Sequence, residues 1–458
     1  MRVHSDLMQA LEAAHGTSLI TPNLQNMVIR YDHHGLVPTT AFISSSLRKV
    51  SYRICLPQNA PVPEQDLLQG LKVIHHCGHL RDLELWSLPY PYGPGYLGAN
   101  LTATISGMCR PSLLCHRARP NPRPALLENL PALERLKMSL DSGLHLGVQH
   151  DSELPLLPQR PKPLRHASLT MDAAEAVDSL LHRIAGVRLE GLKVRLTHRA
   201  SHQSIHKMFA GLAERHPQLK ALDLVHIPYS GVPQNGSQAG EAPASMLVPL
   251  LRLSQLSELN IGGFRIAVDD PLVQDMSMAW PKLVSLTVGE YCDVRDAPHL
   301  VSLSSLAFFA HRCKHLEALT LPVNTNVPLP PLSQVPSIPF AFGLSDSPLK
   351  TLEVGYSTIS NPAAVAAYLS DLFPDLACIS NEWRDIFRFL DNESEEQFRR
   401  WEEVERLIPT FVDVRFQERK AYQDADPIPL DEEADPMITA TENAQMLEMR
   451  ERFASKER

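Results

Sequence analysis

Apolar residues recur along this chain in a six-residue pattern, L-x-x-L-x-L, which is typical of a short β-strand with one buried face. Residues 215–224, RHPQLKALDL, hold one clear copy, in which Leu219, Leu222 and Leu224 are the apolar positions. We call the first leucine of each copy its anchor. Twelve copies align on their anchors, which lie about 32 residues apart on average. The anchors are Leu24, Leu47, Leu80, Leu133, Leu164, Leu189, Leu219, Leu256, Leu283, Leu316, Leu349 and Leu376.

A helix and a stop signal are predicted ahead of many of these strands. Apolar residues spaced i, i+3, i+4 and i+7, as on one face of a helix, occupy residues 65–77, 204–216, 305–313 and 364–373. Proline, which disrupts a helix interior, stands two positions ahead of several anchors, as at Pro217 and Pro281. The position before that proline is often large or a cysteine, as at His216, Trp280 and Cys313. Each unit is therefore predicted to be a helix, a stop, a strand and a loop.

One such unit cannot bury its strand and its helix alone, whereas stacked units bury both against their neighbours. The sequence therefore predicts an α/β solenoid of about 12 irregular units, with parallel strands on the concave face and helices on the convex face. The predicted divisions are an N-terminal helical segment (1–20), the solenoid (21–390), a capping helix (391–423) and an acidic, largely disordered tail (424–458). The 53-residue gap between Leu80 and Leu133 leaves room for another unit near Leu113.

The period of apolar residues changes after the last repeat. One helical face of residues 392–422 gathers aromatic and aliphatic side chains, and Pro409 is expected to kink or split this helix. We interpret the helix as the cap over the last core layer; a partner-binding helix is the alternative. The residues of this face are Phe398, Trp401, Val404, Ile408 and Phe411.

Taken as a set, the repeats over roughly residues 20–390 resemble the leucine-rich-repeat family. The long, irregular units are similar to the F-box-associated leucine-rich-repeat proteins of mushroom-forming fungi (basidiomycetes). That resemblance implies that the repeats capture a substrate for an SCF-type ubiquitin ligase, with an F-box helix bundle docking on a Skp1-type adaptor. No F-box is recognisable here, because the first anchor already lies at Leu24. Either the N-terminus is incomplete or this is a relative without an F-box.

Strand residues alternate between the two faces of a sheet, so the positions two, four and six residues after each anchor are predicted to face away from the core. We expect these residues to bind a protein partner of mixed charge, with Trp86 as the strongest single contact. Ordinary solvated strand residues are the alternative. The candidates are Asp82, Glu84, Trp86, Arg135, Lys137, Lys193, Arg195, Asp223, Glu258, Asn260 and Glu353. Further outward positions are Asn26, Arg30, Lys49, Arg53 and His166.

Charge and cysteine usage narrow the class of protein. The formal net charge of −9 and the isoelectric point near 6.1 disfavour nucleic acid and membrane surfaces as partners. No run of about 18 apolar residues and no apolar signal-peptide core occurs in the sequence. The seven scattered cysteines fit reduced thiols in a cytoplasmic or nuclear protein.

Motifs for catalysis or metal binding are weak. HHCGH (75–79) and CRPSLLCH (109–116) lack a second ligand pair for zinc, and HHCGH occupies a repeat position like HRCKH before Leu316. No phosphate loop, HExxH or nucleophile elbow occurs. The proline-rich segment 322–339 is expected to be a loop, with an SH3 ligand as the alternative. We therefore expect no enzyme, cofactor or metal, but a binding scaffold; an adaptor unrelated to ubiquitination is the runner-up.

Overall fold

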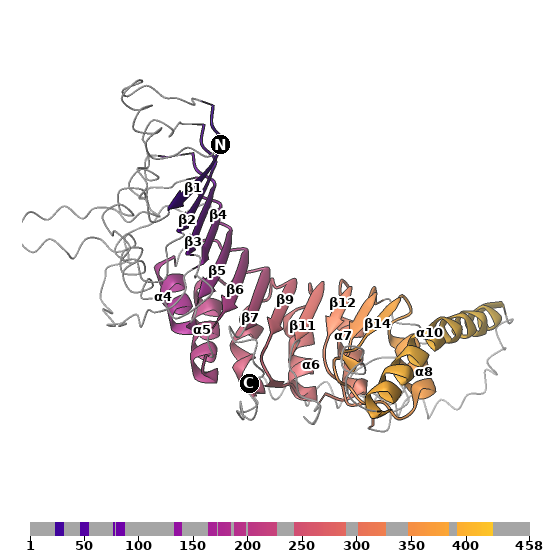
Figure 1. Ribbon diagram of the computed structural model, residues 1–458. Helices are drawn as coiled ribbons and strands as arrows, with labels where there is room; N and C mark the ends of the chain where they lie inside the picture. Colours follow the sequence, from indigo (N-terminus) through magenta and orange to yellow (C-terminus); the bar gives the residue numbers. More distant parts are fainter. Residues whose placement is uncertain are drawn as a thin grey trace, which may run out of the picture.

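The computed structural model contains one twelve-stranded parallel sheet whose strands follow one another in chain order (Figure 1). It describes residues 23–31, 46–54, 77, 79–87, 132–139, 164–171, 173–184, 187–197, 200–226, 242–289, 301–326, 347–383 and 392–424. The strands are β1 (Asn26–Tyr31), β2 (Lys49–Ile54), β3 (Asp82–Ser87), β4 (Arg135–Ser139), β5 (His166–Met171), β6 (Gly191–Leu196), β7 (Ala221–His226), β9 (Glu258–Gly262), β11 (Ser285–Val288), β12 (Ala318–Thr320), β13 (Thr351–Glu353) and β14 (Cys378–Ser380).

Every one of these strands begins two residues after its predicted anchor, so the repeat alignment is confirmed. The strands pair in one shared register, in which Leu192 lies opposite Leu222 and Leu222 opposite Leu259. Strand β3 pairs directly with β4, so no further strand lies between these two in the sheet. Leu113, where another unit seemed possible, lies outside the described residues.

Helices cover the face of the sheet opposite to its concave side (Figure 1). They are α4 (Ala174–Arg183), α5 (His202–Arg215), α6 (Asp270–Ala279), α7 (Leu306–Arg312) and α8 (Pro362–Leu372), joined by the 3-10 turns η3 (Ala244–Met246), η4 (Val248–Arg252) and η5 (Leu303–Ser305). Helices α5, α7 and α8 confirm three of the four predicted helical segments; in the fourth, residues 65–77, only Cys77 is described. A minor two-stranded sheet joins β8 (Ala242–Pro243) to β10 (Ile266–Ala267). The result is a leucine-rich-repeat solenoid.

The stop between helix and strand has the same backbone geometry in successive units. The carbonyl oxygen of His216 accepts a hydrogen bond from the N–H of Leu219 over 3.1 Å, and Trp280 and Leu283 are joined in the same way over the same distance. His216 and Trp280 are both buried, while Pro217 lies in the exposed turn between helix and strand. The position before the proline is therefore a core position in both units, and its carbonyl oxygen closes the turn that leads into the strand.

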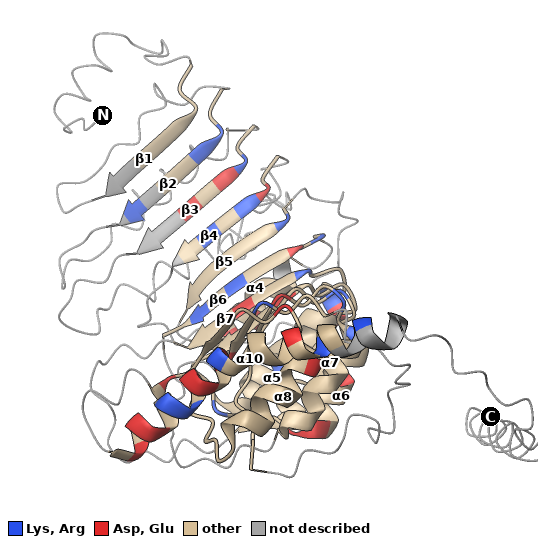
Figure 2. Cartoon of the chain, turned by 90° about the vertical axis from the view of Figure 1, so that its right-hand side faces the viewer, with Lys and Arg blue, Asp and Glu red and all other residues tan. Residues whose placement is uncertain are grey.

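A long helix, α10 (Asn392–Asp424), closes the C-terminal end of the solenoid and packs on α8. Figure 2 views the molecule from that end, with α10 crossing in front of α8. Trp401, Val404 and Ile408 are buried, and the rest of the predicted face is partly buried. The helix runs through the exposed Pro409 and is not split there, while a kink, the other expected outcome, stays a prediction. The apolar face continues on both sides of the proline and packs against the same core.

Side chains of α10 also satisfy polar backbone groups at the open end of the sheet. The Glu405 carboxylate accepts from the N–H of Ile379 in β14 over 3.3 Å. The indole N–H of Trp401 donates to the carbonyl oxygen of Ser357 over 2.8 Å. Unpaired backbone groups on an edge strand are a liability, so the bond to Ile379 in the edge strand β14 makes α10 a structural cap. The segments 1–20 and 425–458 lie outside the described residues, and the predicted domain boundaries stay predictions.

Candidate functional site

The outward side chains of the sheet form two rows that cross the strands, because all the strands share one register. We call the positions two residues after the anchors the first row and those four residues after the anchors the second row. The first row is Asn26, Lys49, Asp82, Arg135, His166, Gly191, Ala221, Glu258, Ser285, Ala318, Thr351 and Cys378. The second row is Val28, Ser51, Glu84, Lys137, Ser168, Lys193, Asp223, Asn260, Thr287, Thr320, Glu353 and Ser380.

A groove of about 640 Å³ runs along these rows and is lined by residues of eight strands, from Lys49 in β2 to Ser285 in β11. Eight of the eleven predicted partner-binding residues line it. They are Asp82, Glu84, Arg135, Lys137, Lys193, Asp223, Glu258 and Asn260. Arg195, which is exposed at the third outward position of β6, and Glu353 on β13 are not among the lining residues. The side chain of Trp86 is outside the described residues.

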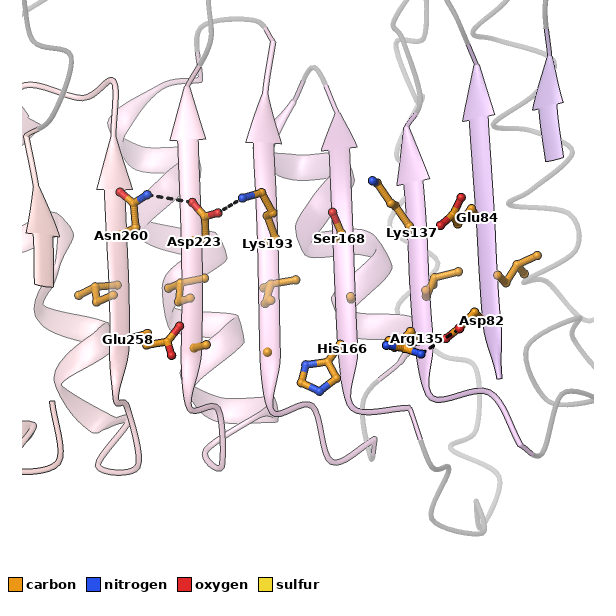
Figure 3. A pocket seen from close by; sticks show the side chains of 18 of the residues that line it. Asp82, Glu84, Arg135, Lys137, His166, Ser168, Lys193, Asp223, Glu258 and Asn260 are labelled. Carbon is orange, nitrogen blue, oxygen red and sulfur yellow. Dashed lines mark hydrogen bonds and ion pairs between the residues drawn. The ribbon is translucent and has the colours of Figure 1, made fainter. Parts of the chain in front are cut away.

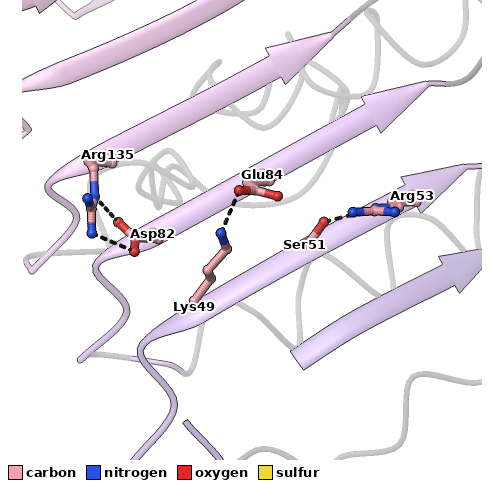
Figure 4. Close-up of polar contacts among 6 residues, drawn as sticks. All are labelled: Lys49, Ser51, Arg53, Asp82, Glu84 and Arg135. Carbon is pink, nitrogen blue, oxygen red and sulfur yellow. Dashed lines mark hydrogen bonds and ion pairs between the residues drawn. The ribbon is translucent and has the colours of Figure 1, made fainter. Parts of the chain in front are cut away.

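Ion pairs tie the N-terminal part of the groove together (Figure 4). Arg135 and Asp82, which lie opposite each other on β4 and β3, form two hydrogen bonds of 2.6 and 2.9 Å. Hydrogen bonding to Asp82 and the negative charge of the Asp82 carboxylate raise the pKa of the Arg135 guanidinium. Lys49 reaches across from β2 to Glu84 over 2.7 Å. The acidic side chains of β3 are therefore held between cations of both neighbouring strands.

A third ion pair lies on the other side of the groove (Figure 3). Lys193 on β6 is paired with Asp223 on β7. The Asn260 side-chain amide of β9 donates to the other carboxylate oxygen of Asp223 over 3.1 Å. These three second-row side chains form a continuous polar chain across three strands.

The centre of the groove is β5, which contributes His166 and Ser168. The His166 ring leans over Gly191 of β6, since a Cβ atom at Gly191 would lie 2.7 Å from His166 Nδ1 (Figure 3). Gly191 and Ala221 are the next two members of the first row, and their small size leaves the floor low between His166 and Glu258. Ser168 was not among the predicted residues, although its position four residues after an anchor marks it as outward-facing.

The residues that line the groove carry balanced charge. Four are basic (Lys49, Arg135, Lys137 and Lys193) and four are acidic (Asp82, Glu84, Asp223 and Glu258). A polyanion such as nucleic acid favours a surface of one sign. The groove instead matches a surface that carries both signs.

Beyond the groove, the sheet changes from charged to hydroxyl-bearing side chains. The Thr287 hydroxyl lies 3.4 Å from that of Thr320, and Thr320 donates to the Glu353 carboxylate over 3.2 Å. Glu353 is therefore part of a second, largely uncharged section of the face, separate from the other predicted site residues.

The described cysteines of the suspected metal motif HHCGH and of the similar HRCKH lie in the core of the repeats. Cys77 and Cys313 are buried, and burial raises the pKa of their thiols to about 11 and about 12. His79 is exposed. The described residues contain no cluster of three or more His, Cys, Asp or Glu side chains that could hold a metal ion. Residues 109–116 and most of the proline-rich segment, 327–339, lie outside the described part.

No protein-family model and no curated protein matches this sequence. Among solved structures, the chain is similar to a leucine-rich-repeat protein of Leptospira interrogans (12% identity, TM-score 0.34, 83% of each chain covered). It is also similar to a chain of the yeast Rad7–Elc1 complex (13% identity, TM-score 0.34, covering 82% of this chain and 81% of that one). A third similar structure is a chain of the Drosophila Toll–Spätzle complex (13% identity, TM-score 0.35, covering 79% of this chain and 41% of that one). With TM-scores this low, we take no function from these likenesses.

No helix within the described ranges is both long enough and apolar enough to cross a lipid bilayer.

Proposed function

We propose that this chain is a non-enzymatic repeat scaffold that captures another protein in the groove on its sheet face. The single observation that carries the proposal is the extent of the groove: eight strands line it. At about 4.8 Å between neighbouring strands, β2 to β11 spans about 34 Å. Sites for small molecules are typically enclosed and mostly apolar, with a few polar groups. A long, open groove lined by charges of both signs fits a protein surface better.

The finer proposal is that the captured protein is a substrate of an SCF-type ubiquitin ligase. It rests on the resemblance of the long, irregular repeats to the F-box-associated proteins, and it implies a Skp1-type adaptor as the second partner. The alternative is an adaptor or scaffold unrelated to ubiquitination, which would use the same groove. A cytoplasmic or nuclear location is part of this proposal, and the buried, unpaired thiols of Cys77 and Cys313 are consistent with a reducing compartment.

Photo-crosslinking from two positions tests the scaffold. The amino acid p-benzoylphenylalanine is placed at Ser168, in the centre of the groove, or at Lys207, which is exposed on α5 on the other face. The chain is expressed in cells of its source, irradiated, and the crosslinked proteins are identified by mass spectrometry. We expect a discrete protein to be captured from Ser168 and not from Lys207. Equal capture from both positions contradicts binding in the groove.

Co-purification separates the two cellular roles. If the chain serves a ubiquitin ligase, a Skp1-type adaptor purifies with the full-length protein, and ubiquitylation of the captured protein falls when this chain is depleted. If the captured protein is found without the adaptor and its ubiquitylation is unchanged, the chain is an adaptor outside that pathway.

A further inference from the structure

The charges in the groove are ordered along the solenoid and not mixed at random. Strand β3 carries two acids, Asp82 and Glu84, which we call the first acidic flank. Strands β4 and β6 carry the central basic block, Arg135, Lys137 and Lys193. Strands β7 and β9 carry the second acidic flank, Asp223 and Glu258. Strand β5, at the centre, has no carboxylate in its sequence HASLTM. From β3 to β9 the order is therefore acidic, basic, acidic.

The ion pairs of the central block lie at its two boundaries. Arg135 is paired with Asp82 on one side, and Lys193 with Asp223 on the other (Figure 3). The Arg135 and Lys193 side chains remain 65% and 43% exposed, so both pairs can still be reached by a partner. In Figure 3 the Lys137 ammonium leans toward β5 and away from Glu84. The boundary pairs thus hold the Arg135 and Lys193 side chains in place at the two sides of the block.

Glu258 is the most accessible acid of the second flank. It is exposed, and its side chain makes no hydrogen bond or ion pair with any other described residue. Its neighbours in the first row are Ala221 and Ser285, which are too small to cover it. A carboxylate in this position can accept hydrogen bonds from a basic side chain without first breaking an internal pair.

We propose that the groove binds an extended segment of its protein partner that runs across the strands, with an acidic side chain over β4–β6 and a basic side chain over each acidic flank. This inference rests on the proposed function and specifies the partner's chemistry. Since neighbouring strands lie about 4.8 Å apart, β5 is about 10 Å from β3 and β7 and about 14 Å from β9. An extended chain covers about 10 Å in about three residues and about 14 Å in about four. The matching charge order is base, two spacers, acid, two or three spacers, base.

Two fluorescent peptides of identical composition test the charge order against the full-length chain. One places glutamates at the centre and lysines at both ends; the other places lysines at the centre and glutamates at both ends. We expect the first peptide to bind at least about ten-fold more tightly than the second at low salt. The second peptide would place its lysines over the basic block and its glutamates over the acidic flanks, and such like-charge contacts disfavour binding. The ratio should shrink as salt screens the charges. Equal binding, a preference for the inverted peptide, or no binding of either peptide overturns the inference. So does stronger binding of an all-acidic peptide, which would indicate a polyanion site.

Charge-reversed variants locate the effect in the groove. Lys137→Glu and Glu258→Lys are each expected to remove most of the preference for the first peptide. The matched controls are Lys207→Glu and Glu214→Lys, two exposed positions of α5 on the other face, which should leave the preference unchanged. Thermal unfolding verifies that all four variants are folded. A preference that survives both groove variants overturns the inference. If capture from Ser168 persists while the peptides bind equally, the scaffold function stands and the charge order fails.

Discussion

His216 Nδ1 lies 3.2 Å from the carbonyl oxygen of Val187, and its Nε2 is buried without a hydrogen-bond partner among the described residues. The corresponding positions of other units hold Trp280, Cys313 and Phe373. His216 is thus a polar side chain at a buried position that Trp280, Cys313 and Phe373 fill with an apolar or thiol side chain. Desolvation by burial lowers the pKa of His216 below its ordinary value of 6.5.

This burial predicts a loss of stability in acid. Above pH 6.5 the imidazole is neutral in both the folded and the unfolded chain, so it adds no pH dependence. Below pH 6.5 the unfolded chain takes up the proton first, and the free energy of unfolding falls by up to about 1.4 kcal/mol per pH unit. His216→Phe should flatten this dependence relative to the unchanged chain. Urea unfolding between pH 5 and pH 8 measures it, and parallel pH profiles for the two proteins would contradict the prediction.

Leu222 is the second leucine of its repeat and is 2% exposed. Leu222→Ala removes buried apolar atoms and leaves a cavity between stacked units, so we expect a loss of about 2–5 kcal/mol in the free energy of unfolding. Lys207→Ala, at an exposed position of α5, is the control and should change stability by less than about 0.5 kcal/mol. Equilibrium denaturation measures both. A loss below about 0.5 kcal/mol for Leu222→Ala would mean that the core relaxes to fill the space.

Trp401 joins the capping helix to the last repeats, both through its buried ring and through the indole bond to Ser357. Trp401→Ala should cost about 3–5 kcal/mol. Because each unit of a solenoid contacts mainly its neighbours, the damage should be local. Amide hydrogen exchange is expected to accelerate first in β14 and α8 and last in β5 and β6. Uniform acceleration along the chain would show that the solenoid unfolds as one cooperative unit.

The ion pair between Asp82 and Arg135 should contribute little to stability, because the Arg135 side chain is largely exposed. A double-mutant cycle with Asp82→Ala and Arg135→Ala is expected to give a coupling energy below about 1 kcal/mol that falls further as salt is added. A larger, salt-independent coupling would assign the pair to the fold and not to the binding surface.

Much of this architecture could be predicted because every strand begins at the same distance from its anchor, so aligned copies also align the strands in the sheet. Aligning the anchors placed every strand start, and it also placed Lys193 beside Asp223 in adjacent copies. Asp82 and Arg135 flank the 53-residue gap that left room for another unit, so only the pairing of β3 with β4 in the structure sets them side by side. The helices α4 and α6 were not among the predicted segments. The contacts of α10 with Ser357 and Ile379 join residues far apart in the sequence, so no local pattern reveals them. Which cation pairs with which acid depends on side-chain conformation: Lys193 turns toward β7, while Lys137 leans toward β5.

The shared register separates what holds the solenoid together from what a partner would meet. All twelve units place the same inward leucine-type positions side by side, so in terms of packing the units are close to interchangeable. The outward charges are not interchangeable in this way, because the partner that they would match depends on the order of the charges along the sheet. Exchanging the β5 and β7 units would preserve the inward rows and scramble the acidic, basic, acidic sequence. In this protein the fold depends on the composition of its units, and the proposed recognition depends on their arrangement.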